Sequence, residues 1–130
     1  MFKKEITYTD YNGTERTETF YFNLSKAELA EMQLSASGGF ESYIQSIIEA
    51  KDAASMVKIF KDVILMSYGE KSPDGKRFIK NAEVRDSFAQ TEAYSVLFME
   101  LVSDDKAASA FINGIMPSDL QEQLGAEIVK

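Results

Sequence analysis

The residues that could perform catalysis are few, because the sequence contains neither histidine nor cysteine. Without them there is no imidazole base, no thiolate nucleophile, no Cys/His zinc site and no disulfide. The remaining nucleophilic arrangement is Ser72, which lies close in sequence to Lys71 and Lys76, as in a Ser/Lys pair. No nucleophile elbow or oxyanion-hole pattern surrounds this serine. We therefore expect no catalytic residues and predict that the chain is not an enzyme.

Two further motifs have structural interpretations. Asp104 and Asp105 are adjacent carboxylates, but acidic residues at the start of a helix are favoured by the helix dipole. The segment GEKSPDGK at 69–76 lacks the glycine spacing and the Lys-Ser/Thr ending of a phosphate-binding loop. It also lacks the repeated acids of a calcium-binding loop. We predict a helix cap and a turn here, and neither a metal site nor a cofactor site.

The charge is distributed unevenly over a chain whose formal net charge is −7. The segment from Gln90 to Lys130 holds seven acidic residues and two lysines, whereas the segment from Glu70 to Asp86 is slightly basic. An acidic chain repels the phosphate backbone, so we predict no nucleic-acid partner. No apolar run approaches the length of a membrane span, and the N-terminal residues lack the apolar core of a signal peptide. We expect a cytoplasmic location and no membrane partner.

The first residues predict a β-hairpin around Asn12 and Gly13, because Thr, Tyr and Phe are frequent on both sides of this turn signal. A two-residue turn would place Ile6 opposite Thr19 and put the apolar residues of the two strands on opposite faces. A three-residue loop with Gly13 in the left-handed region avoids this conflict. We therefore predict the three-residue loop, with one face formed by Phe2, Ile6, Tyr8, Phe20 and Phe22.

Helices follow the hairpin. Ser25 and Glu28 form a capping box, and Leu24 with Leu29 forms a hydrophobic staple, so a first helix begins here. A small-residue break at 35–39 separates it from a second helix. The apolar residues expected on that second helix are Phe40, Tyr43, Ile44, Ile47 and Ile48. The apolar residues expected on a third, with Asp52 as its N-cap and its end near Gly69, are Met56, Val57, Phe60, Val63 and Ile64.

The second half of the chain begins with a turn-rich loop from Gly69, containing a short extended piece at Arg77 to Ile79. A short helix containing Val84 and Phe88 precedes Thr91, which is the expected N-cap of a helix over 92–102. That helix is apolar nearly all round, so we expect it to be buried on both sides.

The last predicted helix is capped by Asp104 or Ser103 and ends with Gly114 as its C′ residue, and Pro117 stops it. These elements together predict a helix-dominated α+β fold in a single domain over 1–130. The domain would consist of a β-hairpin at 1–24, a helical body of about five to six short helices at 25–117, and a C-terminal tail at 118–130.

Two segments resemble tail assembly chaperones of long-tailed, siphovirus-type bacteriophages. They are AYSVLFMEL…DDKAASAFINGIMP at Ala93 to Pro117 and YGEKSPDGKRFIK at Tyr68 to Lys80. The resemblance implies a small cytoplasmic protein of the host cell that binds and solubilises the tape measure protein during tail assembly and is absent from the mature virion. It also implies a possible longer, frameshifted form that contacts the tail tube protein.

A chaperone of this kind needs apolar surface for its client and, for a long client, often self-assembly. We therefore expect a homo-oligomer whose protein-binding residues are Tyr94, Val96, Leu97, Met99, Val102, Phe111, Ile112 and Ile115. Each of these residues could instead be ordinary core. Two other functions remain open: a structural tail completion or connector protein, and a small acidic inhibitor or regulatory protein that mimics nucleic acid.

Overall fold

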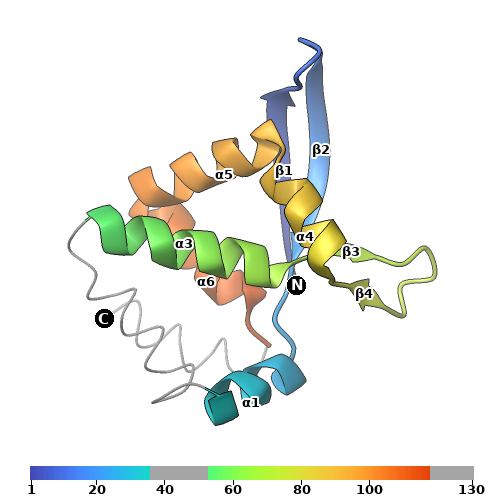
Figure 1. Ribbon diagram of the computed structural model, residues 1–130, viewed down its shortest axis with the longest axis vertical. Helices are drawn as coiled ribbons and strands as arrows, with labels where there is room; N and C mark the ends of the chain where they lie inside the picture. The colour runs from blue at the N-terminus through green and yellow to red at the C-terminus, as the bar shows by residue number, and fades with distance from the viewer. Residues whose placement is uncertain (36–52, 118–130) are drawn as a thin grey trace.

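The computed structural model describes residues 1–35 and 53–117, in which a four-stranded antiparallel sheet carries its helices on one side (Figure 1). The strands are β1 (Phe2–Thr9), β2 (Glu15–Phe22), β3 (Tyr68–Lys71) and β4 (Phe78–Ile79), in the order β1-β2-β3-β4. The helices are α1 (Lys26–Ser35), α3 (Ala53–Ser67), α4 (Ala82–Ala89), α5 (Glu92–Ser103) and α6 (Asp105–Ile115).

This architecture confirms the α+β class and the N-terminal hairpin, and the described segments contain five helices. The predicted second helix, its apolar residues Phe40, Tyr43, Ile44, Ile47 and Ile48, the cap Asp52 and the tail 118–130 lie outside the described residues.

The register of the first hairpin is the predicted one. Gly13 has a φ of +82°, and β1 pairs with β2 so that Phe2 faces Phe22 and Ile6 faces Glu18. The Asp10 carboxylate accepts the backbone N–H groups of Asn12, at 2.9 Å, and of Thr14, at 3.0 Å. This contact stabilises the three-residue loop, and the resulting pairing gathers the apolar residues of both strands on the face covered by the helices.

A second hairpin, β3–β4, lies where the turn-rich loop was predicted from Gly69 onward, and residues 72–77 form its loop. α3 ends at Ser67, close to the end predicted near Gly69, and Gly69 itself pairs with Tyr21 in the sheet. A Cβ atom at Gly69 would lie 2.7 Å from Cε2 of Phe78 and 2.9 Å from the carbonyl oxygen of Ile79. The glycine is therefore needed for the close approach of β4, and the expected extended piece corresponds to this strand.

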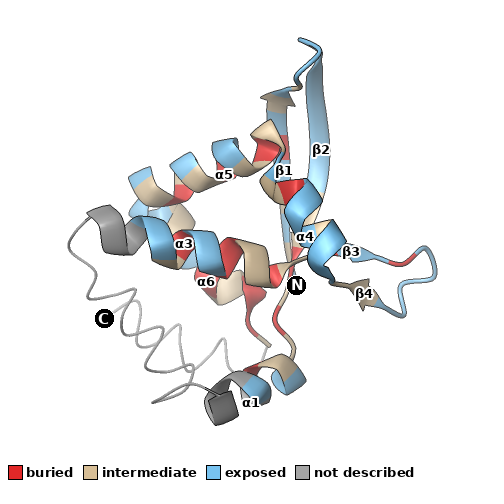
Figure 2. Ribbon diagram, in the orientation of Figure 1, coloured by how far each residue is buried: buried red, intermediate tan, exposed pale blue. Residues whose placement is uncertain are grey.

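The core lies between the sheet and the helices, where buried residues gather on the inner surfaces (Figure 2). Phe22 is fully buried and packs edge-on against Phe111, with ring centroids 5.2 Å apart. Phe88 lies 5.8 Å from Phe22 and stacks on Tyr68 at 4.1 Å. Aromatic pairs of this kind contribute about 0.5–1.5 kcal/mol each beyond the burial of their surface.

The helix caps agree with the sequence. Ser25 and Glu28 exchange backbone-to-side-chain hydrogen bonds of 2.9 and 3.2 Å, as in a capping box. Thr91 accepts the N–H of Tyr94, and Asp104 caps α6. The other carboxylate oxygen of Glu28 accepts a hydrogen bond from Lys80 Nζ at 2.6 Å, which ties α1 to the start of α4.

Gly114 is not the C′ residue that was predicted, because it lies inside α6 and lacks a positive φ. A Cβ atom at this position would lie 3.1 Å from Cγ and 3.2 Å from Cβ of Phe2, and closer still to the ring atom Cδ1. The missing side chain makes room for the Phe2 ring, so Gly114 sets the approach of α6 to β1. The helix ends at Ile115 with Met116 as its C-cap, and Pro117 follows.

Candidate protein-binding site

The inner face of α5 belongs to the core. Ala93, Leu97 and Leu101 are buried, and their spacing of four residues directs them to the same side of the helix. Tyr94 and Phe98 lie beside them, with ring centroids 6.0 Å apart. Burial raises the pKa of Tyr94, and the charge of Asp62 on α3 raises it further. One flank of α5 therefore packs against α3.

The outer face of α5 is apolar and exposed, so the expectation that this helix is buried on both sides is wrong. The side chains of Val96 and Met99 are 40% and 58% exposed, and Val102 is half-buried. Steps of three residues make these side chains neighbours on one surface, which we call the outer stripe. Ser95 and Ser103 lie at its sides and carry no charge.

The eight residues predicted to bind protein separate into two groups. Leu97, Phe111, Ile112 and Ile115 are buried in the core of the described fold, where they have a packing role. Tyr94, Val96, Met99 and Val102 are exposed or half-buried on α5. The structure therefore brings the accessible candidates together on one helix and places α6 behind them. Val57 on α3, 47% exposed, was not among the predicted site residues.

Acidic groups border the outer stripe. Glu100 forms an ion pair of 2.8 Å with Lys4 on β1, which anchors α5 to the sheet. Glu92 lies at the N-terminal end of α5, and its hydrogen bond to the Tyr11 hydroxyl raises the pKa of that tyrosine. Asp104 and Asp105 lie at the C-terminal end. An apolar stripe with an acidic border favours a partner that combines apolar and basic side chains.

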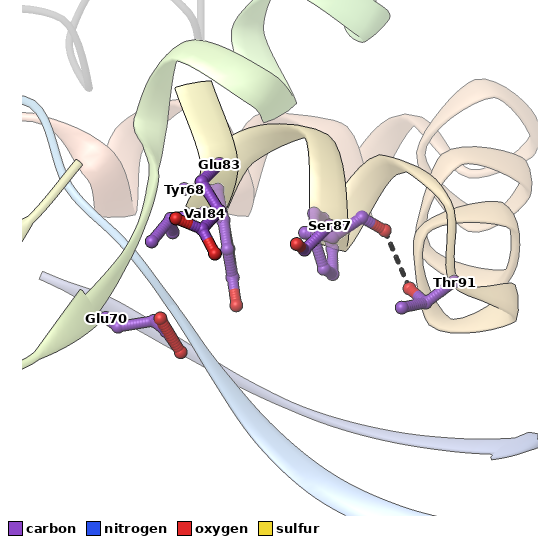
Figure 3. A pocket seen from close by; sticks show the side chains of 7 residues that line it. Tyr68, Glu70, Glu83, Val84, Ser87 and Thr91 are labelled. Carbon is purple, nitrogen blue, oxygen red and sulfur yellow. Dashed lines mark hydrogen bonds between the residues drawn. The ribbon is translucent and has the colours of Figure 1, made fainter. Parts of the chain in front are cut away.

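A second feature is an open pocket of about 270 Å³ between β3 and α4 (Figure 3). Glu70 comes from β3 and Glu83 from α4, and both lie near Tyr68. Burial is the main cause that raises the pKa of Tyr68 to about 12, and the charges of Glu70 and Glu18 add to it. The pocket therefore combines an aromatic wall with negative potential. We name it the acidic pocket.

The acidic pocket also contains hydroxyl groups, but their contacts are structural. The Thr91 hydroxyl donates to the carbonyl oxygen of Phe88 at 2.7 Å and caps α5 (Figure 3). Within residues 1–35 and 53–117 no group of three acidic side chains is arranged to hold a metal ion. In the same ranges no helix is both long and apolar enough to cross a membrane.

The sequence was not sufficient to find the acidic pocket, because Glu70 and Glu83 belong to different elements. The pocket exists only because α4 packs beside β3. The sequence shows a mixture of acidic and basic residues between Glu70 and Asp86. This mixture indicates a solvated region, but it does not identify which charged side chains lie close together in the fold.

Comparison with known protein families agrees with the resemblance seen in the sequence. A family model described as phage tail assembly chaperone matches residues 1–128, which is nearly the whole chain. Comparison with curated proteins and with solved structures gives no match. Because the family model covers far more than half of the sequence, the chain belongs to the phage tail assembly chaperone family.

Proposed function

We propose that this protein binds amphipathic helical segments of the tape measure protein through the outer stripe and keeps that protein soluble during tail assembly. Membership of the family supports a role in tail assembly, and it does not identify the client. The observation that carries the proposal is the exposure of Val96 and Met99 on a helix whose other face is anchored in the core.

The outer stripe suits a helical client for physical reasons. An amphipathic helix presents an apolar row of similar spacing, and the side chains of two such rows interdigitate. Met99 has an unbranched, flexible side chain that adapts to different apolar partners. Basic side chains beside the client's apolar row would meet Glu92 and Glu100 at the border of the stripe.

A single copy offers little binding energy, which is the reason to expect several copies on one client. Complete burial of a Val or Met side chain contributes roughly 1.5–3 kcal/mol, and association has an entropic cost of at least about 4 kcal/mol. A long client with repeated apolar rows binds a homo-oligomer more tightly, because later contacts are intramolecular. We therefore include self-association in the proposal.

The remaining parts of the proposal concern location and partners. The chaperone acts in the host cytoplasm and leaves before the virion is complete, and a frameshifted longer form contacts the tail tube protein. Mass spectrometry of purified virions separates this proposal from a structural tail completion or connector protein, because the chaperone would be missing. An acidic inhibitor that mimics nucleic acid would instead bind a nucleic-acid enzyme in a salt-sensitive manner.

The experiment is co-expression with the tape measure protein, the very long helical protein of the same phage, followed by measurement of the client's soluble fraction. The wild-type chain should keep the client soluble and co-purify with it. Val96→Ser combined with Met99→Ser should abolish both effects and leave the fold intact, because both side chains are exposed. Val57→Ser is the matched control, because it removes an exposed valine from another helix. An insoluble client with the wild-type chain would refute the proposal.

A further inference from the structure

The β3–β4 hairpin projects from the body of the molecule, on the side away from α5 (Figure 1). We call residues 71–80 the β3–β4 arm. Its loop is exposed apart from Ser72 (Figure 2). Lys76 and Arg77 are adjacent at this loop, and neither forms an ion pair with any residue that the structure describes. The arm therefore presents two free positive charges on a chain whose net charge is −7.

The loop of the arm is held rigidly by its own hydrogen bonds. The Ser72 hydroxyl donates to Asp74 at 2.6 Å and accepts the N–H of Arg77 at 3.0 Å. The Ser72 hydroxyl is also the main cause that lowers the pKa of Asp74, so this carboxylate stays charged and in place. Gly75 has a φ of +77°, which the turn requires. A loop already ordered in this way loses little conformational entropy on binding.

The acidic pocket has the opposite charge. Glu70 and Glu83 are exposed, and neither has an ion-pair partner in the described part of the chain. Glu18 lies at the margin, where it accepts a hydrogen bond from the Tyr8 hydroxyl and lies 3.7 Å from the guanidinium of Arg16. Burial is the main cause of the raised pKa of Tyr68, and the charges of Glu70 and Glu18 raise it further.

A notch beside β2 extends the acidic pocket. In the described sheet, β2 pairs with β3 at Tyr21 and Phe22, and the two strands then separate. The backbone groups on this side of Glu15 to Thr19 are therefore open to another extended segment. The notch measures about 340 Å³ and shares Tyr68 and Glu70 with the acidic pocket. Lys71 also lines it, but its ammonium lies 4.8 Å from the Tyr21 ring centroid.

We infer that the acidic pocket and its notch receive the β3–β4 arm of a second copy of this chain, with Lys76 and Arg77 placed between Glu70 and Glu83. The contact joins two different surfaces, so it is heterologous and repeats head to tail into a ring or an open spiral. The occupant is a second copy because the chain itself carries the complementary surface. Its arm is exposed, ordered and positive, and the acidic pocket on an otherwise acidic chain is negative.

This inference deepens the self-association that is part of the proposed function, and it makes no use of the outer stripe. The two ideas therefore fail separately. Loss of client binding with intact self-association would count against the outer stripe alone. Loss of self-association on changing the arm would weaken client binding only through the loss of multivalency, and it would leave the outer stripe of each copy unchanged.

The test is a charge exchange, read by sedimentation velocity of the purified full chain over a range of protein concentrations. The wild-type chain should form species heavier than its 14.6 kDa monomer, and these should dissociate when the salt concentration rises from about 0.05 M to about 0.5 M. Glu70→Lys with Glu83→Lys should raise the apparent dissociation constant by about tenfold or more, because like charges then face each other. Lys76→Glu with Arg77→Glu should do the same.

Restoration is the decisive result. An equimolar mixture of the two double variants should associate again, because each then meets a surface of opposite charge, and so should the chain that carries all four substitutions. Lys58→Glu with Lys61→Glu lowers the net charge by as much as the arm variant does, at exposed positions of α3, and should leave self-association in place. A wild-type chain that stays monomeric, a double variant that associates like the wild type, or a mixture that fails to associate would each overturn the inference.

Discussion

Replacing Gly114 by alanine should destabilise the protein, although the same change at an exposed helix position stabilises by about 1 kcal/mol. The added Cβ would lie 3.1 Å from Cγ of Phe2 and closer to Cδ1, so the ring must move. Phe2 packs edge-on against Phe111 with ring centroids 5.3 Å apart, and this contact would be weakened. Overpacking costs about 1–3 kcal/mol, and the close approach to the ring favours the upper part of this range, about 2–3 kcal/mol. Subtracting the helix gain of about 1 kcal/mol leaves a net loss of about 1–2 kcal/mol.

The assay is urea unfolding followed by far-UV circular dichroism, with the free energy of unfolding taken from linear extrapolation. Phe2→Ala provides the matched background, because it removes the ring that the new methyl group meets. In that background Gly114→Ala should be neutral or stabilising by up to about 1 kcal/mol, which yields a positive coupling between the two sites. A stabilising effect of Gly114→Ala in the wild-type background would refute the packing role assigned to this glycine.

Two further predictions concern charged and titratable groups. Lys80→Met should lower the free energy of unfolding by about 1 kcal/mol, because the Lys80 ammonium is a partly buried donor to Glu28 at 2.6 Å. Urea unfolding measures this change, and an unchanged midpoint would show that the contact is not stabilising. The folded-state pKa of Tyr68 is raised to about 12 from an ordinary value of 10.0, so its contribution to stability is complete below pH 10.0 and is lost as the pH rises toward about 12. Tyr68→Phe should therefore show a flatter decline of unfolding free energy over that pH window than the wild type, and equal slopes would contradict the burial of this hydroxyl.

The features that were predictable from sequence are those decided by neighbouring residues. The capping box of Ser25 and Glu28 needs only a serine and a glutamate three positions apart, and the helix N-terminus supplies the rest. The register of the first hairpin followed from the alternation of apolar side chains and from the left-handed Gly13. Local hydrogen bonds and the period of two leave little choice in these places.

The features that were not predictable depend on distant contacts. Gly69 was predicted to begin a turn-rich loop and Gly114 to end a helix, because the sequence does not distinguish a glycine that permits close packing from one that forms a turn or ends a helix. Their actual neighbours, Phe78 and Phe2, are identified only by the fold. In the same way, nothing in the sequence pairs Lys4 with Glu100 across 96 positions.

The candidate site was predicted in part for a related reason. A helix that is apolar nearly all round does not reveal which face the core takes, so both Leu97 and Met99 were predicted to bind protein. Packing against β1 and α3 buries Leu97 and leaves Met99 exposed. The acidic pocket needed α4 and β3 to be placed side by side, which no periodic pattern encodes.

Oxidative footprinting of Met99 tests the central claim most directly. The purified complex with the tape measure protein and the free chaperone are exposed to hydroxyl radicals, and the oxidation rate of each methionine is measured by mass spectrometry. Met1, 50% exposed and the residue before β1, is the internal control because it does not belong to the outer stripe. The account predicts that the client slows oxidation of Met99 and leaves Met1 unchanged. Equal oxidation of Met99 in the free and bound chaperone would contradict it.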